Sequence, residues 1–240
     1  MKNWLVWSFV AAVCAVSLSP ALKADDPKPP RTVTPVPRPD PGWQKRQQMI
    51  NERAKEGNVD LIFIGDSITQ GWHPMAGVWK KYYGKRNAMN AGIGGDQTQH
   101  VLYRLENGNL ENIKPKLAVI MIGTNNAGSD SAEEIAAGIK AIVKKIREMR
   151  PETKILVLGV FPRSPKPDKT REKLTKVNEI ISKEADGKMV HYLDIGPKFL
   201  EADGSISPDI MYDYLHLTDT GYAIWGEAIE SKVAELMGEK

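Results

Sequence analysis

The feature that most limits the possible folds of this chain is an apolar run at residues 61–64, Leu-Ile-Phe-Ile, which ends abruptly in Gly65-Asp66-Ser67. Four consecutive apolar residues with β-branched and aromatic members predict a strand buried on both faces, as in a parallel sheet. Gly65 permits a sharp exit, so Ser67 should lie just past the carboxyl end of the strand, where open α/β sheets bind ligands. Ser67 is therefore a candidate nucleophile, although an isolated Gly-Asp-Ser is more often the N-cap of a helix.

The rest of the chain alternates short apolar runs with amphipathic segments. Further strands are predicted at residues 87–92, 116–123, 154–161 and 189–195, and helices at 43–57, 98–107, 131–150, 168–183 and 219–237, with a loop and a short helix at 72–83. Ser131 and Glu134 form a capping box at the start of one helix. This alternation predicts an α/β fold, a flavodoxin-like three-layer α/β/α sandwich with about five parallel strands, and it shows no internal repeat or second domain.

The first residues, 1–24, have the pattern of a secretory signal peptide. Lys2 supplies a positive start, residues 4–18 are almost wholly apolar, and small residues follow, so cleavage is expected after Ala21 or Ala24. An uncleaved membrane anchor is the alternative, for which the apolar run is short. We therefore expect a secreted or periplasmic protein with no stable membrane span after processing.

Residues 25–42 contain seven prolines among charged and polar residues. A segment of this composition cannot build a core of its own, and it predicts an extended, semi-rigid linker or tether. The ordered domain is then expected to span residues 43–240.

Charge and cysteine content exclude several classes of function. Removal of residues 1–24 takes away Lys2 and Lys23 and no acidic residue, so the 33 basic residues become 31 against 30 acidic ones. The basic character of the whole chain is thus partly due to the leader and gives no reason to expect a nucleic-acid partner. Cys14 is the only cysteine and lies in the leader, so the processed chain has no disulfide, thiol nucleophile or thiolate metal site.

Polar residues follow each of the first three predicted strands. Gly65-Asp66-Ser67, Gly94-Gly95-Asp96 and Gly123-Thr124-Asn125-Asn126 should all lie on the carboxyl edge of the sheet. Late in the chain, Asp213 and His216 are three residues apart, so one turn can bring them together. The carboxylate would then fix the imidazole tautomer while the other ring nitrogen faces Ser67. A glycine N–H after the second strand and the Asn125 amide would join the Ser67 N–H as donors to an oxyanion.

These four blocks resemble those of the SGNH (GDSL) hydrolase family, and they are most similar to its platelet-activating-factor acetylhydrolase alpha-subunit branch. The resemblance extends from about Trp43 to the C-terminus and includes residues 91–96, 107–116 and 215–218. It implies that Ser67 is the nucleophile, that His216 is the general base and acid, and that Asp213 orients it. The same resemblance places the N–H groups of Ser67 and Gly95 and the Asn125 side chain in the oxyanion hole, and the preference for Gly95 over Gly94 depends on it.

Other polar residues receive simpler interpretations. Asp96 is expected to accept hydrogen bonds beside the site rather than to act as a catalytic acid. His73, His100 and His191 are expected to be structural or solvated, because no spacing typical of metal ligands connects them.

The pattern predicts a secreted serine esterase that forms an acyl-enzyme and requires no metal or organic cofactor. Ile68 and Leu215 flank the nucleophile and the base, and we expect their bulk to form a small acyl pocket that favours acetyl. The expected substrates are O-acetyl groups on carbohydrates or, second, small lipid esters. Two alternatives remain open, an acyltransferase and a non-catalytic module that binds acetylated glycans. A homodimer is suggested by the resemblance alone.

Overall fold

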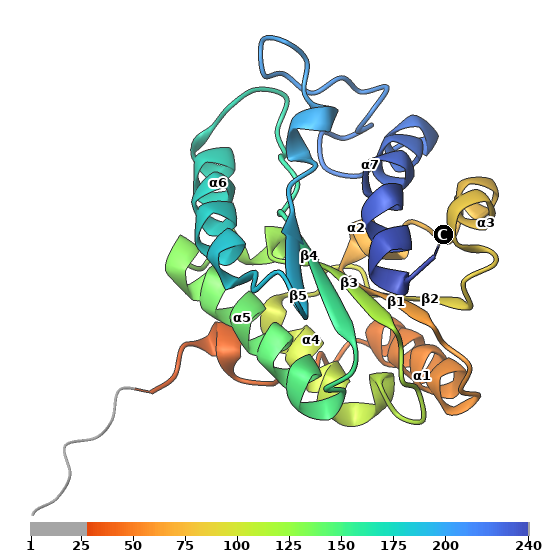
Figure 1. Ribbon diagram of the computed structural model, residues 1–240. Helices are drawn as coiled ribbons and strands as arrows, with labels where there is room; N and C mark the ends of the chain where they lie inside the picture. Colours follow the sequence, from red (N-terminus) through yellow and green to blue (C-terminus); the bar gives the residue numbers. More distant parts are fainter. Residues whose placement is uncertain (1–27, 240) are drawn as a thin grey trace, which may run out of the picture.

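The computed structural model describes residues 28–239 (Figure 1). The predicted signal peptide at residues 1–24 lies outside these residues, and so does the start of the predicted linker. Within the described range no helix combines the length and the apolar character needed to cross a bilayer.

A five-stranded parallel sheet forms the centre of the molecule, with the strand order β2-β1-β3-β4-β5. The strands are β1 (Leu61–Gly65), β2 (Ala88–Gly92), β3 (Leu117–Met121), β4 (Lys154–Leu158) and β5 (Val190–Leu193). This order is that of flavodoxin-like sheets, so the predicted fold is confirmed. The chain order reverses between β1 and β3, and ligands bind such sheets in the crevice beyond the carboxyl ends of the strands at that point.

Helices cover both faces of the sheet (Figure 1). One face carries α1 (Pro41–Lys55), α4 (Thr98–Arg104), α5 (Ala132–Met149) and α6 (Lys169–Ile181), and the other carries α2 (Ser67–Gln70), α3 (Ala76–Tyr83) and α7 (Asp219–Met237). Short helical turns connect them at η1 (Arg31–Val33), η2 (Leu105–Asn109), η3 (Thr124–Asn126), η4 (Ser182–Glu184) and η5 (Gly196–Phe199). The three predicted layers are therefore present, and the predicted helices differ from the observed ones only near their ends.

Alternation along the central strands divides the core into two clusters. Ile62 and Ile64 face α1, α4, α5 and α6, whereas Leu61 and Phe63 face α2, α3 and α7. All five residues of β1 are buried, as the uninterrupted apolar run predicts. The second cluster is rich in aromatic rings, and the Phe63 ring lies 4.7 to 6.4 Å from the rings of Trp72, Trp79, Tyr83 and Trp225.

Local signals in the sequence set the start of several helices. The Ser131 side chain accepts a hydrogen bond from the Glu134 N–H at 3.1 Å, and the Glu134 carboxylate accepts one from the Ser131 N–H at 2.8 Å. This reciprocal pair is the predicted capping box. Asp168 caps α6 in a similar way by accepting from the Arg171 N–H.

The proline-rich stretch is not a free tether in its described part, and this prediction is wrong for residues 28–42. Thr32 is wholly buried, and its carbonyl accepts a hydrogen bond from the Thr98 hydroxyl at 2.9 Å. Arg31 forms an ion pair with Asp130 at 2.6 Å, and the Val36 N–H donates to the Gln99 carbonyl. Proline lacks an N–H, so an extended proline-rich segment can lie against a folded surface with few unpaired donors. We refer to residues 28–40 as the N-terminal segment.

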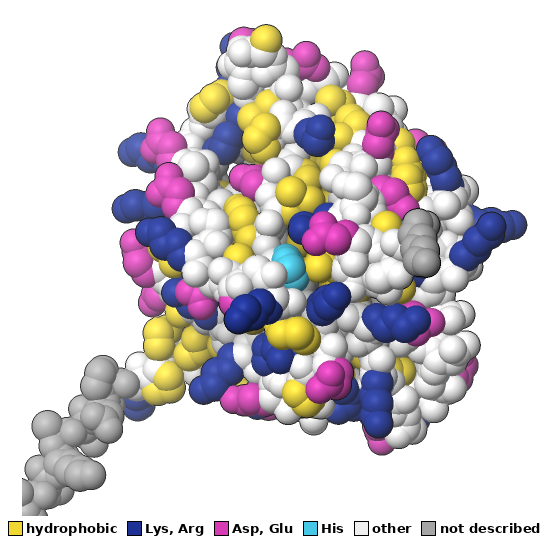
Figure 2. Space-filling view, viewed as in Figure 1, with side chains coloured by type: hydrophobic (Ala, Val, Ile, Leu, Met, Phe, Trp, Pro, Cys, Tyr) yellow, Lys and Arg dark blue, Asp and Glu magenta, His cyan; other side chains and the backbone are white. Residues whose placement is uncertain are grey.

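Charged side chains of both signs are interspersed over the face shown in Figure 2. No extensive region of one sign is visible on this face, which agrees with the near balance of basic and acidic residues in the sequence.

Candidate active site

Three side chains from two distant parts of the chain form a continuous hydrogen-bonded row at the carboxyl edge of the sheet. Ser67 begins α2 directly after β1, and its Oγ lies 2.9 Å from His216 Nε2. His216 Nδ1 lies 2.6 Å from Asp213 Oδ2. The carboxylate favours the tautomer that carries its proton on Nδ1, and this leaves Nε2 free to accept the hydroxyl proton of Ser67. The predicted nucleophile, base and orienting acid are thus in contact.

The loop before α7 fixes the relative position of Asp213 and His216. Met211 and Leu217 form an antiparallel bridge that closes the loop. Within it, Asp213 Oδ1 accepts hydrogen bonds from the backbone N–H groups of Leu215 and His216, at 3.1 and 2.7 Å. Partial burial opposes ionisation of Asp213, but these bonds and the adjacent imidazole outweigh it and lower the pKa of the carboxyl. Asp213 therefore remains a carboxylate beside the imidazole.

Asp66 caps α2 and leaves the Ser67 hydroxyl free for His216. Its Oδ1 accepts a hydrogen bond from the Ile68 N–H at 3.0 Å, so the helix-cap interpretation of Gly-Asp-Ser is correct for the aspartate. The side chain is wholly buried, and its Oδ2 has no hydrogen-bond partner among residues 28–239. Burial raises the pKa of Asp66 to about 7 against the opposing hydrogen bond from Ile68.

The glycines after β2 form a tight turn against the nucleophile. A Cβ on Gly94 would lie 3.7 Å from the Ser67 Cβ, so the two loops are in close contact. The Gly94 N–H donates to Gln70 Oε1 at 2.6 Å, whereas no group among the described residues accepts from the Gly95 N–H. Gly95 has a φ of +77°, a conformation that favours glycine. The structure thus leaves Gly95 rather than Gly94 with an available donor.

The asparagines after β3 have different surroundings. The Asn125 side chain donates one N–H to the Asp96 carbonyl at 2.9 Å, which holds its amide against the turn after β2 and leaves its second N–H for a ligand. Asn126 is wholly buried, accepts from the Thr98 N–H at 3.0 Å and donates to Asp130 at 2.8 Å. Asn125 is therefore placed beside the Gly95 turn, and Asn126 holds the loop in position.

A buried ion pair lies beneath these loops. Asp96 Oδ2 and Arg104 Nε are 2.8 Å apart, and neither side chain is exposed. Asp96 also accepts from the Trp43 indole at 2.7 Å, as expected for a hydrogen-bond acceptor beside the site. Arg104 donates in addition to the carbonyls of Gly65 at 3.2 Å and Ala91 at 2.9 Å, and so connects the ends of β1 and β2. Sequence reasoning missed Arg104, although it lies eight residues after Asp96 in a predicted helix.

Ser67 and His216 open onto a cleft of about 410 Å³. Its other lining residues are Gln70, Gly71, His73, Pro74, Met75, Tyr212, Leu217 and Tyr222. The Tyr212 side chain is 62% exposed, and its ring stacks on His216 with centroids 5.9 Å apart. Ile68 is 1% exposed within the core, and Leu215 packs against the same cluster, so neither lines this cleft as predicted. Ile68 points inward because it occupies the core-facing side of the short helix α2.

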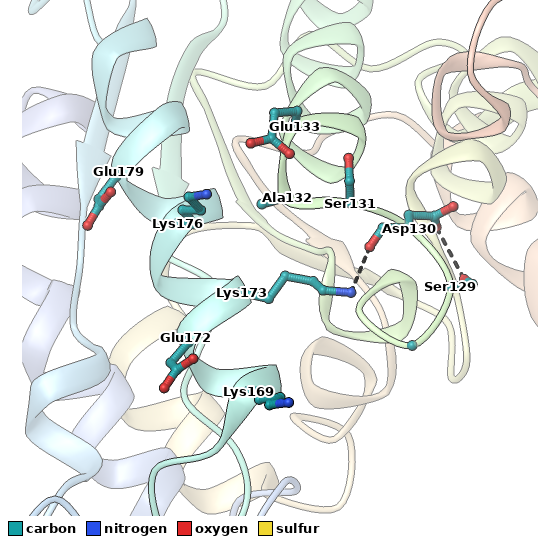
Figure 3. Close-up of a pocket in the computed structure, with 11 residues that line it drawn as sticks. Ser129, Asp130, Ser131, Ala132, Glu133, Lys169, Glu172, Lys173, Lys176 and Glu179 are labelled. Carbon is teal, nitrogen blue, oxygen red and sulfur yellow. Dashed lines mark hydrogen bonds between the residues drawn. The ribbon is translucent and has the colours of Figure 1, made fainter.

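A wider groove of about 800 Å³ lies between the start of α5 and the α6 helix (Figure 3). It is lined mainly by charged side chains, among them Glu133, Glu172 and Lys176, and Lys173 Nζ is held there by the Asp130 carbonyl at 2.9 Å. None of the residues Ser67, His216 and Asp213 lines this groove. Reactive groups in mutual contact identify a site better than volume does, and the cleft at Ser67 is therefore the candidate active site.

The remaining histidines do not form a metal site. His100 Nδ1 accepts a hydrogen bond from the Gln97 N–H at the start of α4, and burial together with nearby arginines lowers the pKa of His100 to about 4. His191 Nε2 lies 3.2 Å from the Lys188 carbonyl, and His73 lines the cleft. Within residues 28–239 no three His, Cys, Asp or Glu side chains cluster as metal ligands would.

The chain is similar to known proteins in sequence and in fold. Residues 63–224 match the GDSL-like lipase/acylhydrolase family. Platelet-activating factor acetylhydrolase IB subunit alpha1 of Bos taurus is 42% identical over 196 residues, which cover 81% of this chain and 84% of that protein. A GDSL-like lipase from Bacteroides thetaiotaomicron has a similar fold, with a TM-score of 0.65 at 19% identity over 79% of this chain and 97% of that one. A catalytic mutant of an acetylxylan esterase from Geobacillus stearothermophilus gives a TM-score of 0.60 at 19% identity over 77% and 96%.

Proposed function

Because this chain belongs to the GDSL-like lipase/acylhydrolase family, we propose that it is a serine esterase that hydrolyses short-chain esters, acetyl esters above all. The observation that carries this proposal is the unbroken contact from Asp213 through His216 to Ser67 Oγ. A serine hydroxyl is a weak nucleophile unless an oriented base removes its proton, and this row supplies such a base.

The proposed reaction has two steps. In the first, His216 Nε2 takes the proton of Ser67 Oγ as the oxygen attacks the ester carbonyl, and the same proton then passes to the departing alkoxide. In the second, water attacks the acyl-enzyme, His216 accepts a proton from that water, and Ser67 recovers it as the carboxylic acid leaves. Asp213 keeps its negative charge throughout and stabilises the imidazolium that forms transiently.

Three N–H groups would stabilise the negative oxygen of each tetrahedral intermediate. They belong to the Ser67 backbone, the Gly95 backbone and the Asn125 side chain. The Gly95 donor is unpaired in the described chain, and Asn125 is held in place by Asp96. Removal of one such donor typically lowers the rate about 10²–10³-fold.

The acyl group and the leaving group are inferred from different observations. The names of two similar proteins, a platelet-activating factor acetylhydrolase and an acetylxylan esterase, support acetyl as the acyl group. On the leaving-group side, the cleft offers the polar side chains of Gln70 and His73 and the exposed ring of Tyr212. Polar groups together with an aromatic face suit a sugar, so we place O-acetylated carbohydrate first and small lipid esters second. Export directed by residues 1–24 would bring the enzyme to extracellular polysaccharides.

The test is hydrolysis of p-nitrophenyl esters of increasing chain length by the protein, with Ser67→Ala and His216→Ala alongside. Matched controls are Ser182→Ala and His191→Ala, which change the same residue types at positions away from the cleft. We expect the rate to be highest with acetate, to fall by at least about 10⁴-fold in the first pair of variants and to stay unchanged in the controls. Acetylated xylo-oligosaccharides and short-chain phospholipids then distinguish the two leaving groups.

Two results would contradict the proposal. Equal turnover by Ser67→Ala and the parent protein would exclude Ser67 as the nucleophile. A folded protein that cleaves none of these esters would not be an esterase, and acyl transfer to an added sugar or simple binding of acetylated glycan would then be measured instead.

A further inference from the structure

Two successive peptide groups of the turn at Gly94 and Gly95 are each held by a side chain. Gln70 Oε1 accepts from the Gly94 N–H at 2.6 Å, which fixes the preceding peptide unit. Arg38 Nη1 donates to the Gly94 carbonyl at 2.6 Å, and that carbonyl belongs to the same peptide group as the Gly95 N–H. A Cβ on Gly95 would lie 2.9 Å from Arg38 Nη1, so the guanidinium lies directly against this turn. The only unpaired polar end of this peptide group, among the described residues, is the proposed oxyanion donor.

We propose that Arg38 is a positioning residue that orients and polarises the Gly95 N–H for the oxyanion. This proposal rests on the esterase function proposed above. Amide resonance transfers electron density from nitrogen to oxygen, and a cation at the oxygen increases that transfer. The N–H at the other end of the peptide group then becomes a stronger donor, because hydrogen bonds in a chain polarise one another.

The guanidinium is itself held in a fixed position. Its Nη2 lies 3.0 Å from Asp40 Oδ2, and its Nη1 lies 3.7 Å from the buried Asp96 Oδ1. Asp40 accepts from the Trp43 N–H as the cap of α1, so Arg38 is held between two anchored carboxylates. Its side chain is 25% exposed, and solvent therefore screens its charge only in part. A fixed donor needs little rearrangement during the reaction, and this is what makes such groups effective.

A purely structural role for Arg38 is the alternative, because arginines elsewhere also hold the backbone. Arg53 offers the matched case, since its Nη1 donates to the Gly57 carbonyl at 2.8 Å at the end of α1. Arg53 is partly exposed, as Arg38 is, and it donates to a glycine carbonyl, but Gly57 lies against Asn112, whereas Gly94 lies against Ser67. The two roles can therefore be separated by comparing the same substitution at both positions.

The kinetic test measures kcat and KM for p-nitrophenyl acetate with Arg38→Ala, Arg38→Gln, Arg38→Lys and Arg53→Ala, and the unfolding midpoint of each in urea. We expect Arg38→Ala and Arg38→Gln to lose kcat by about 10-fold with little change in KM, because the interaction strengthens in the transition state. Arg38→Lys should recover part of the loss, since it restores the charge without the planar fork. Millimolar guanidinium ion should partly restore Arg38→Ala and leave the parent protein unchanged.

A second measurement does not depend on turnover. The amide proton of Gly95, followed by NMR in ¹⁵N-labelled protein, should move upfield in Arg38→Ala and stay in place in Arg53→Ala, because a less polarised N–H is more shielded. An unchanged kcat in Arg38→Ala, or a loss of kcat that Arg53→Ala shares in proportion to its loss of stability, would overturn the proposal. An unmoved Gly95 resonance would overturn it as well. Failure of the parent protein to cleave any ester would instead contradict the esterase function, and the NMR comparison would still decide whether Arg38 polarises this amide.

Discussion

Replacement of Arg104 by methionine should cost the protein much of its stability. The guanidinium is wholly buried and pairs with the equally buried Asp96 at 2.8 Å. It also donates to the carbonyls of Gly65 and Ala91 and to the side chain of Asn109. Methionine fills a similar volume but donates no hydrogen bond, so the carboxylate and three further acceptors lose the Arg104 donor at once. Asp96 keeps the Trp43 indole, and the Gly65 carbonyl keeps the Ile93 N–H.

The magnitude follows from what is left unpaired. Breaking a buried ion pair by removing one partner typically costs about 3–5 kcal/mol, and each orphaned buried acceptor adds about 1–3 kcal/mol, although such losses are not additive. Uptake of a proton by Asp96 limits the total, because a neutral carboxyl is less costly to bury than a charged one. We expect a loss of about 5 kcal/mol at pH 7, which is a large part of the 5–15 kcal/mol typical of native proteins.

The assay is urea unfolding followed by circular dichroism at pH 7 and pH 5. Arg104→Met should be less destabilised at pH 5, where Asp96 can take up a proton more easily. The double variant with Asp96→Asn should be more stable than Arg104→Met alone, because it removes the buried negative charge that has lost its ion pair with Arg104. Arg104→Lys keeps the measurement possible if methionine prevents folding. A loss below about 1 kcal/mol in Arg104→Met, with an unchanged slope, would refute the reasoning.

Two further predictions concern stability. Burial raises the pKa of Asp66 to about 7 from 3.8. Between these pH values the folded protein holds a proton that the unfolded chain has released. The free energy of unfolding must therefore fall as the pH rises from about 4 to about 7. The control is Asp66→Asn, which keeps the cap acceptor without the charge. Relative to it, the parent protein should lose up to about 4 kcal/mol of unfolding free energy over that pH range in urea titrations. Parallel curves of unfolding free energy against pH for the two proteins would contradict this. Ser131→Ala removes the acceptor for the Glu134 N–H and should cost about 1 kcal/mol of stability in thermal unfolding, with no change in the proposed esterase activity. An unchanged midpoint would show that the cap contributes nothing.

The fold was predictable because each element carries a local signal. The uninterrupted apolar run at 61–64 predicted a strand buried on both faces, and β1 is that strand. Some predicted strands were too long. Ile122 and residues 159–161 are apolar or small and remain buried beyond the hydrogen-bonded ends of β3 and β4, so the sequence there resembles a strand. Ile122 and Val160 belong to the cluster covered by α5 and α6, whereas Phe161 packs on Phe199 of η5 and Trp225 of α7. These contacts are tertiary and cannot be read from the local sequence.

The site was predictable where spacing alone determines contact. Asp213 and His216 meet within one loop, and Ser67 follows β1, which lies beside β3 where the chain order of the sheet reverses. Arg38 was missed because the proline-rich composition of its segment resembles that of a linker. Only the folded structure shows that carbonyls and side chains of this segment, such as the Thr32 carbonyl and the Arg38 guanidinium, find hydrogen-bond partners. Ile68 was assigned to the cleft from its position beside Ser67, but the first turn of α2 directs it to the core.

The aromatic cluster beneath the nucleophile gives the protein a built-in optical reporter. Trp72, Trp79 and Trp225 are three of its six tryptophans, and the ring of Trp72 lies 5.7 and 5.1 Å from the other two. Indoles at such separations exchange excitation energy, so unfolding, which separates them, must change both the intensity and the anisotropy of their emission. Trp72 also lies 4.7 Å from Tyr222, whose side chain lines the cleft. A molecule bound at Ser67 is therefore one aromatic ring away from the emitting cluster, and its arrival can be followed by fluorescence without any attached label.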